Sequence, residues 1–295
     1  MPRIYFQFAS TIALLFLGAN SQTTPGIQEM FLGRCEYFKE FGYQQPKPVI
    51  CSEAWNAFFK AFGAKDPCTV SIENYTSYFS MTSKYQTPPR DMTLLWSGTQ
   101  ELKSVLCADG IHCYANDQFM PSYLVGKMNW CGSKTDPSGM NFTGCRSYDR
   151  DDCPKHVTYS FWAAASQQLA LASTGVVRLL LDGTRTNGSA YSRDSFFAKY
   201  ELPNLNPSRV TALEAIVALT PGQPVKEDCD SASMLLLKND VANQNLPYRC
   251  IMNPPVVKHA SCGFFADQPA TCNFQYPLLA NKRRQLKKYT SQDSI

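Results

Sequence analysis

The sequence predicts an α/β protein that combines a helical part with a small, mainly parallel sheet, and three observations support this. Apolar residues recur at helical spacing in the first part of the chain after its apolar leader, and continuous apolar runs of strand length follow further on. Helical or loop segments separate these runs, as expected for parallel strands that are buried on both faces. The 295 residues suffice for one large domain or two ordinary ones.

The helical segments come first along the chain. Helical spacing of apolar residues predicts helices in 26–42 and 53–63, and each segment closes at a glycine, a residue common at helix ends. A further helix is expected after Pro121. The alanine-rich segment 160–175 predicts another helix, which also ends at its final glycine. These helices can form one layer.

Four short apolar runs, 92–96, 176–183, 210–219 and 248–252, predict the strands of a four-stranded sheet. The first run lies within the helical part, so the two domains are expected to be interleaved rather than consecutive. The predicted units are a helical domain and an α/β domain, followed by a basic tail: 22–89 plus 115–172, 90–114 plus 173–280, and 281–295.

Residues 1–21 have the features of a secretory signal peptide, with one early arginine, a short apolar stretch, and small residues before a cleavage site after Ser21. The apolar stretch is shorter than the roughly 20 residues of a membrane span, and no second such stretch follows. We therefore expect a protein without a transmembrane segment, secreted or stored in a secretory vesicle. Three sequons, at Asn74, Asn141 and Asn187, are candidate glycosylation sites.

All 12 cysteines follow the leader, and an even number in an exported chain predicts six disulfides. The alternative, a metal site, is disfavoured because the chain lacks a Cys-x-x-Cys pair and its 3 histidines do not have HExxH spacing. The net charge of +4 comes largely from the tail, so composition does not indicate a nucleic-acid binder. The chain also lacks a GxSxG elbow, a phosphate loop and a GxGxxG turn after a strand, which disfavours common hydrolases, NTPases and Rossmann dehydrogenases.

Four stretches remain as candidates for chemistry: LLWSG around Trp96, NWCG around Trp130, SFWAAAS around Trp162, and DSFFAKYELPNL, which contains Glu201. Together with FLGRC and FFKAF nearer the N-terminus, they resemble the signature motifs of the ADP-ribosyl cyclase family. The residues in these motifs are most similar to those of the molluscan members of the family. The resemblance covers about nine tenths of the chain after the leader, so it is far more specific than any single short motif.

The resemblance implies a two-lobed α/β fold with the active site in the cleft between the lobes. It implies an enzyme that cleaves the nicotinamide–ribose bond of NAD, forms cyclic ADP-ribose and ADP-ribose, and exchanges the base of NADP. On this expectation NAD and NADP are substrates, no cofactor or metal is needed, the partner is a small nucleotide, and the protein forms a homodimer.

Residue by residue, the catalytic glutamate of the family falls on Glu201. A single carboxylate suits this reaction, because nicotinamide leaves as a neutral base and needs no general acid. Trp96 and Trp162 match the two tryptophans that stack on the rings of the substrate. Ser166 matches the serine that binds the phosphates and lies one helical turn after Trp162; Ser97 is a weaker candidate for this role.

Two further positions bear on the product. Phe196 matches a phenylalanine of the molluscan cyclases, and a bulky ring there should help to fold the linear intermediate and displace water. The chain departs from the family's Thr-Leu-Glu-Asp motif, since Asp117 stands for the glutamate and Gln118 for the aspartate. The family glutamate holds the nicotinamide amide, so a catalytic role carries over to Asp117, but its shorter side chain puts the contact and the product ratio in question.

The resemblance also implies five disulfides, Cys35–Cys51, Cys68–Cys153, Cys131–Cys145, Cys229–Cys250 and Cys262–Cys272. The two remaining cysteines, Cys107 and Cys113, are close enough in sequence to pair with each other. Two alternatives to an active enzyme stay open: a secreted binding or receptor-like protein of the same fold with little catalysis, and an unrelated disulfide-rich secreted protein. The first would show Asp117 or Gln118 blocking the pocket, and the second would show the tryptophans dispersed through separate cores.

Overall fold

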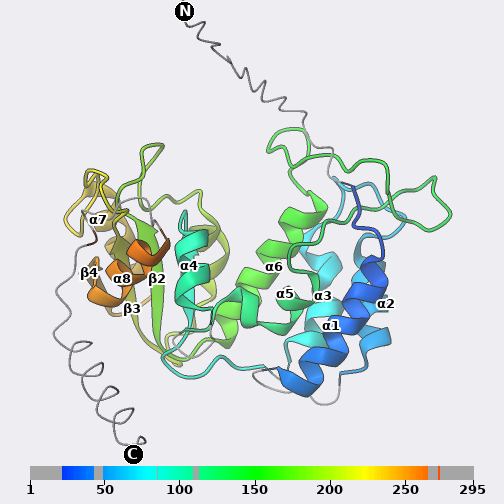
Figure 1. Cartoon of the computed structure of the whole chain (residues 1–295), viewed down its shortest axis with the longest axis horizontal. Helices are drawn as coiled ribbons and strands as arrows, with labels where there is room; N and C mark the ends of the chain where they lie inside the picture. The colour runs from blue at the N-terminus through cyan, green and yellow to red at the C-terminus, as the bar shows by residue number, and fades with distance from the viewer. Residues whose placement is uncertain (1–21, 43–48, 85, 109–112, 265–271, 273–295) are drawn as a thin grey trace, which may run out of the picture.

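The computed structural model describes residues 22–42, 49–84, 86–108, 113–264 and 272 (Figure 1). The expected signal peptide and basic tail lie outside these residues. The helices are α1 (Ile27–Phe41), α2 (Cys51–Phe62), α3 (Thr76–Thr82), α4 (Gln100–Leu106), α5 (Met120–Val125), α6 (Val157–Ala172), α7 (Ala232–Asn243) and α8 (Pro255–Phe264). The strands are β1 (Leu94–Ser97), β2 (Gly175–Asp182), β3 (Val210–Ala218) and β4 (Tyr248–Met252).

Helices α1, α2, α3, α5 and α6 form one lobe, on the right of Figure 1. Its core is aromatic, and Phe58 at the centre contacts the rings of Phe31, Trp130 and Phe161 at centroid distances of 5.6, 5.2 and 5.9 Å. The predicted ends of α1 and α2 are correct, since the N–H groups of the two C-cap glycines donate to helix carbonyls. These helices supply the rigid base on which α6 faces the sheet lobe.

The predicted end of α6 at Gly175 is wrong by a few residues. The last helical residue is Ala172, and the Ser173 hydroxyl donates to the carbonyl of Leu169 at 2.8 Å, which closes the helix. Gly175 instead begins β2 with φ 74°, and a Cβ there would lie 2.1 Å from Oδ1 of Asp91. The glycine is therefore needed for the sharp entry into the strand.

The sheet contains β1, β2, β3 and β4 in that order, and all pairs are parallel, as the apolar runs predict. Alternate residues of β2 point to opposite faces: Leu179 and Leu181 pack with α7, while Leu180 packs with α4 and α8. Helices thus cover both faces of the sheet, which explains its continuous apolar strands. Because β1 joins the sheet from between α3 and α4, the chain crosses between the lobes more than once (Figure 1).

Six disulfides join the same pairs that the sequence suggests: Cys35–Cys51, Cys68–Cys153, Cys107–Cys113, Cys131–Cys145, Cys229–Cys250 and Cys262–Cys272. The Cys107–Cys113 bridge joins the end of α4 to the segment before the short 3₁₀ turn η2 (Asn116–Gln118). This bridge therefore anchors a turn that carries two of the residues discussed below. Within the described residues, none of the helices is both long and apolar enough to cross a membrane.

Candidate active site

A cavity of about 650 Å³ lies between the two lobes, at the carboxyl ends of β1 and β2. This is where parallel sheets commonly bind ligands, because the loops that leave the strands surround the opening. Its size falls within the usual range for ligand sites, roughly 300–1,000 Å³. The cavity is lined by Trp96, Ser97, Gly98, Gln100, Lys103, Asn116, Asp117, Trp162, Ser166, Arg185, Ser192, Asp194, Ser195, Phe196 and Glu201.

Glu201 is a buried carboxyl group in the wall of this cavity. It ends η3 (Phe197–Glu201), a single π-helical turn of a kind that often occurs at functional sites, and it is only 5% exposed. Burial raises its pKa to about 8, and the nearby Ser166 hydroxyl partly opposes that rise. Its Oε2 has no hydrogen-bond partner among the described residues. A buried acceptor with a raised pKa is typical of a group that acts on a ligand.

Trp162 and Ser166 come from α6, one helical turn apart, so both reach the cavity from the same side. The Trp162 ring stands edge-on against Phe161, with centroids 5.2 Å apart and planes at 90°. Because Phe161 is itself fully buried in the helical lobe, this contact holds the indole of Trp162 in a fixed orientation at the cavity wall.

Trp96 and Ser97 end β1 and face the cavity from the sheet lobe. The Trp96 backbone is in register with Leu180 of the neighbouring strand, so the sheet fixes the position of the indole. The Lys103 ammonium lies 5.7 Å from the centre of the Trp96 ring. The two half-buried tryptophans thus line the same cavity from opposite lobes, which excludes the alternative that they are dispersed through separate cores.

Phe196 lines the cavity just before the π-helical turn. Its ring contacts Tyr159 and Tyr200 at centroid distances of 4.8 and 5.3 Å, and the Tyr200 hydroxyl donates to that of Tyr159 at 3.2 Å. Tyr159 also stacks on Tyr148 at 4.4 Å. This aromatic cluster restricts the orientations that are open to the Phe196 ring.

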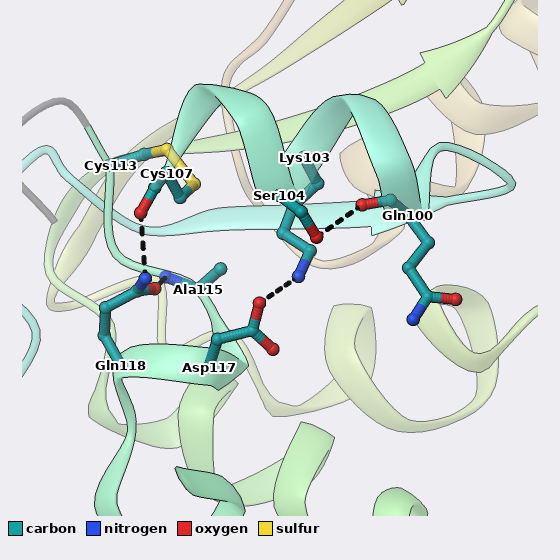
Figure 2. A network of polar contacts seen from close by, with 8 residues as sticks. All are labelled: Gln100, Lys103, Ser104, Cys107, Cys113, Ala115, Asp117 and Gln118. Carbon is teal, nitrogen blue, oxygen red and sulfur yellow. Dashed lines mark hydrogen bonds and ion pairs between the residues drawn. A yellow bond between two sulfur atoms is a disulfide. The ribbon is translucent and has the colours of Figure 1, made fainter. Parts of the chain in front are cut away.

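The neighbouring side chains of Asp117 and Gln118 have different positions relative to the cavity and different partners (Figure 2). Asp117 lines the cavity and forms an ion pair with Lys103. The Gln118 side chain is not part of the lining: its Nε2 donates to the carbonyl of Cys107 at 2.9 Å, and its Oε1 accepts from the N–H of Ala115 at 2.9 Å. Gln118 therefore fastens η2 to α4, and neither side chain fills the cavity.

Sequence reasoning missed several residues of the lining, most importantly Lys103, Arg185 and Asn116. The sequence carries no signal for them, because a lysine in a short helix and an arginine in a loop are usually solvated. Asn116 neighbours Asp117, but only the structure shows that its Oδ1 is buried without a hydrogen-bond partner among the described residues. No cluster of three or more candidate metal ligands occurs in the described parts of the chain.

The three sequon asparagines lie outside the cavity lining. Asn187 is exposed, whereas Asn74 and Asn141 are half-buried and accept hydrogen bonds from Ser71 and Thr143. Their glycosylation stays a prediction.

Comparison with known proteins identifies the class to which this fold and cavity belong. The sequence model of the ADP-ribosyl cyclase family matches residues 24–272. The chain therefore belongs to the ADP-ribosyl cyclase family, as its motifs indicate, and the family consists of enzymes.

Individual relatives agree. The ADP-ribosyl cyclase/cyclic ADP-ribose hydrolase of Aplysia kurodai is 34% identical over 83% of this chain and 85% of the relative. ADP-ribosyl cyclase/cyclic ADP-ribose hydrolase 2 of Homo sapiens is 30% identical over 92% of this chain and 82% of its own. A crystal structure of Aplysia cyclase with the substrate NGD and the product cGDPR superposes with a TM-score of 0.79, at 31% identity, and covers 86% of this chain and 99% of its own. A structure of porcine CD38 gives a TM-score of 0.68 at 27% identity, covering 80% of this chain and 99% of its own.

Proposed function

We propose that the protein cleaves the nicotinamide–ribose bond of NAD and closes the product to cyclic ADP-ribose, with some ADP-ribose released, and that it exchanges the base of NADP to give NAADP. The observation that carries this proposal is the buried Glu201 carboxyl in the wall of a cavity of about 650 Å³ that Trp96 and Trp162 also line. NAD and NADP are substrates in this proposal, and neither a cofactor nor a metal is required.

Glu201 stabilises the positive charge that develops on the ribose. When the C1′–N bond breaks, its electron pair goes to the ring nitrogen and nicotinamide leaves neutral, so the charge moves to the ribosyl carbon. A carboxylate in a water-poor wall stabilises that charge strongly. The cationic pyridinium of the bound substrate favours the ionised form of Glu201, which is protonated at neutral pH in the empty cavity because its pKa is about 8.

The remaining lining residues bind the two ends of the dinucleotide. Trp96 and Trp162 offer faces for stacking with the pyridinium and the purine, each contact contributing roughly 0.5–2 kcal/mol. Ser166, with Ser97 as a weaker candidate, donates to the phosphates. The Phe196 ring, held by its tyrosine neighbours, favours a folded intermediate in which adenine N1 rather than water reaches the ribosyl carbon.

The proposal includes the compartment and assembly of the protein. Six disulfides fit an oxidising compartment, which supports secretion or storage in a secretory vesicle. A homodimer is expected from the resemblance alone.

The alternative of a binding protein with little catalysis is disfavoured by the open cavity. The Gln118 side chain is not part of the lining and donates to the Cys107 carbonyl, and Asp117 forms an ion pair with Lys103 (Figure 2). About 650 Å³ remains for a ligand beside Glu201.

The test is the product distribution after incubation with NAD and with nicotinamide guanine dinucleotide, resolved by chromatography. We expect cyclic products from the wild type and at least a 10³-fold lower turnover for Glu201→Gln, which is of the order expected for losing a central charge-stabilising group. A matched control is Glu214→Gln, a buried glutamate that pairs with Arg178 and Arg249 in the sheet lobe and does not line the cavity.

Each outcome has a distinct meaning. Loss of turnover only in Glu201→Gln supports the proposal. Linear ADP-ribose as the sole product of the wild type would replace the cyclase assignment by a glycohydrolase. No turnover by the folded wild type would contradict the proposal and favour the binding protein.

A further inference from the structure

The ion pair between Lys103 and Asp117 is an unusual feature of the cavity, because one member is buried and the other is not. The Lys103 side chain is 3% exposed, whereas that of Asp117 is 58% exposed. Lys103 belongs to α4 and Asp117 to η2, and the two side chains point toward each other across the gap between these elements (Figure 2). Burial of a lysine is costly and rare unless the charge is paired.

The two elements that carry this pair are fastened together independently of it. The Cys107–Cys113 disulfide joins the end of α4 to the segment before η2, and the Gln118 amide donates to the Cys107 carbonyl (Figure 2). Since these links already fix α4 against η2, the ion pair is not needed for that purpose. Its position in the cavity lining suggests a role toward a ligand instead.

The pair still has hydrogen-bonding capacity. A lysine ammonium has three N–H donors, and among the described residues Lys103 donates only to Asp117. A carboxylate can accept about four hydrogen bonds, and Asp117 receives this one from a side chain. The pair as a whole is neutral, so it presents a donor beside an acceptor rather than a net charge.

A primary carboxamide matches that arrangement, because its carbonyl accepts and its amino group donates. A phosphate fits less well, since its oxygens would meet the Asp117 carboxylate as well as the ammonium. The Lys103 ammonium lies over the face of the Trp96 ring, 5.7 Å from its centre, so a flat base that packs against this indole would lie close to the ammonium.

We propose that Lys103 is a substrate-binding residue that donates to the carbonyl of the leaving base, while Asp117 accepts from its amino group. The inference rests on the proposed function and on the carboxamide-binding role that the family resemblance implies for the position of Asp117, and it adds Lys103 as the residue that selects pyridines with a 3-carbonyl group. Heterolysis of the C1′–N bond sends the electron pair to the ring nitrogen, and neither side chain gains or loses a proton in this step.

The test compares three substrates: NAD, its analogue with an acetyl group in place of the carboxamide, and its analogue with an unsubstituted pyridine ring. The acetyl analogue keeps the carbonyl and lacks the amino group. For each substrate the measured quantity is kcat/KM of the variant divided by that of the wild type, so differences in leaving-group reactivity cancel.

We expect Lys103→Met to lower kcat/KM about tenfold for NAD and for the acetyl analogue, as for one lost charge-assisted hydrogen bond. The penalty should fall below about twofold for the unsubstituted analogue, because that ring makes no such bond. Asp117→Ala should lose activity on NAD but not on the acetyl analogue. Lys39→Met on α1, which also loses an ion-paired lysine but lies outside the cavity lining, is the matched control.

A uniform penalty of Lys103→Met on all three substrates would overturn the proposal and indicate a structural role. A loss of kcat/KM in Lys103→Met that depends on the purine would also overturn it. Such a loss would occur with NAD but not with nicotinamide guanine dinucleotide. Binding of free nicotinamide and free pyridine, followed by tryptophan fluorescence, separates this inference from the proposed function. Even if the wild type fails to cleave NAD, weaker binding of nicotinamide but not of pyridine to Lys103→Met supports the inference, and equal binding contradicts it.

Discussion

Three carboxylates line the cavity, and two of them, Glu201 and Asp117, have opposite surroundings. Glu201, in the wall formed by η3 and α6, is 5% exposed and has no cationic partner among the described residues. Asp117, in the wall formed by η2 and α4, has a side chain that is 58% exposed and is paired with the buried Lys103. The same functional group is therefore prepared for two different tasks.

Desolvation is the physical origin of this difference. Burial without a counter-ion raises the free energy of the Glu201 carboxylate, so it binds a proton until a cationic substrate arrives. Asp117 keeps its contact with water, and its ion pair with Lys103 orients its side chain. The comparison assigns reactivity to the Glu201 wall and recognition to the Asp117 wall, and the following predictions test this division.

The largest expected effect is the pH dependence of catalysis. Activity requires ionised Glu201, whose pKa is about 8 in the free enzyme, so kcat/KM should fall about tenfold per pH unit below pH 8. The fall of kcat with decreasing pH should occur at lower pH, because the pyridinium of the bound substrate favours the ionised form of Glu201. Initial rates at subsaturating and saturating NAD between pH 5 and pH 9 measure both limbs. A flat kcat/KM profile over this range would contradict the assignment of Glu201.

The second prediction concerns stability. Because the folded-state pKa of Glu201 lies above its unfolded value, the carboxyl stabilises the fold fully below about pH 4.5, and this contribution is lost as pH rises to about 8. Glu201→Gln removes this dependence, so near pH 9 it should be more stable than the wild type by about 2–4 kcal/mol, with a much smaller difference near pH 5. Thermal or urea unfolding at both pH values measures the effect.

The control for that stability experiment is Glu214→Gln, at a buried glutamate that has two arginine partners. This variant should be less stable than the wild type at both pH values, because it leaves the two arginines without their carboxylate. Equal behaviour of the two glutamate variants would remove the distinction between an unpaired and a paired buried carboxyl.

The third prediction tests the asymmetry of the ion pair. Asp117→Ala leaves the buried Lys103 ammonium without its partner and should cost about 1–2 kcal/mol of unfolding free energy. Lys103→Met leaves only a mostly exposed carboxylate and should cost less than about 0.5 kcal/mol. The double variant should regain most of the loss, which urea unfolding of all four proteins measures as a double-mutant cycle. Equal costs for the two single variants would show that burial does not govern the pair.

Most of the fold could be predicted from sequence, because its signals are local. The four apolar runs lie within a few residues of the observed strands, and β4 matches its predicted bounds. The end of α6 could not be placed correctly, since a glycine that follows a helix can serve either as its stop or as the start of the next element. Only the contact of Gly175 with Asp91, 84 residues earlier, distinguishes these roles.

The site residues also include some that the sequence predicts and some that it does not. Trp162, Ser166 and Glu201 lie within recognisable motifs, and the spacing of the first two on one helix predicts a shared face. Lys103 could not be found, because its partner Asp117 comes from another segment 14 residues later and its burial depends on how α4 meets η2. Charge pairing across segments leaves no periodic signature in a single sequence.

The smallest expected effect concerns Arg185, a cation of the lining that lacks an ion-pair or hydrogen-bond partner among the described residues. Its guanidinium lies 3.4 Å from the place of a Cβ on Gly98, another residue of the lining. A dinucleotide carries two phosphate charges, so Arg185 should attract them, whereas the paired Lys103 should contribute little.

We expect Arg185→Ala to raise KM for NAD about fivefold at low salt with kcat unchanged, and the difference to shrink as ionic strength increases, because the arginine is exposed. Arg146→Ala, at another exposed arginine that lies outside the cavity lining, is the control. Steady-state kinetics at several salt concentrations measure the effect. A fall in kcat without a change in KM would indicate that Arg185 acts in the chemical step, as Glu201 does. Reactivity would then depend on the loop after β2 as well as on the wall formed by η3 and α6.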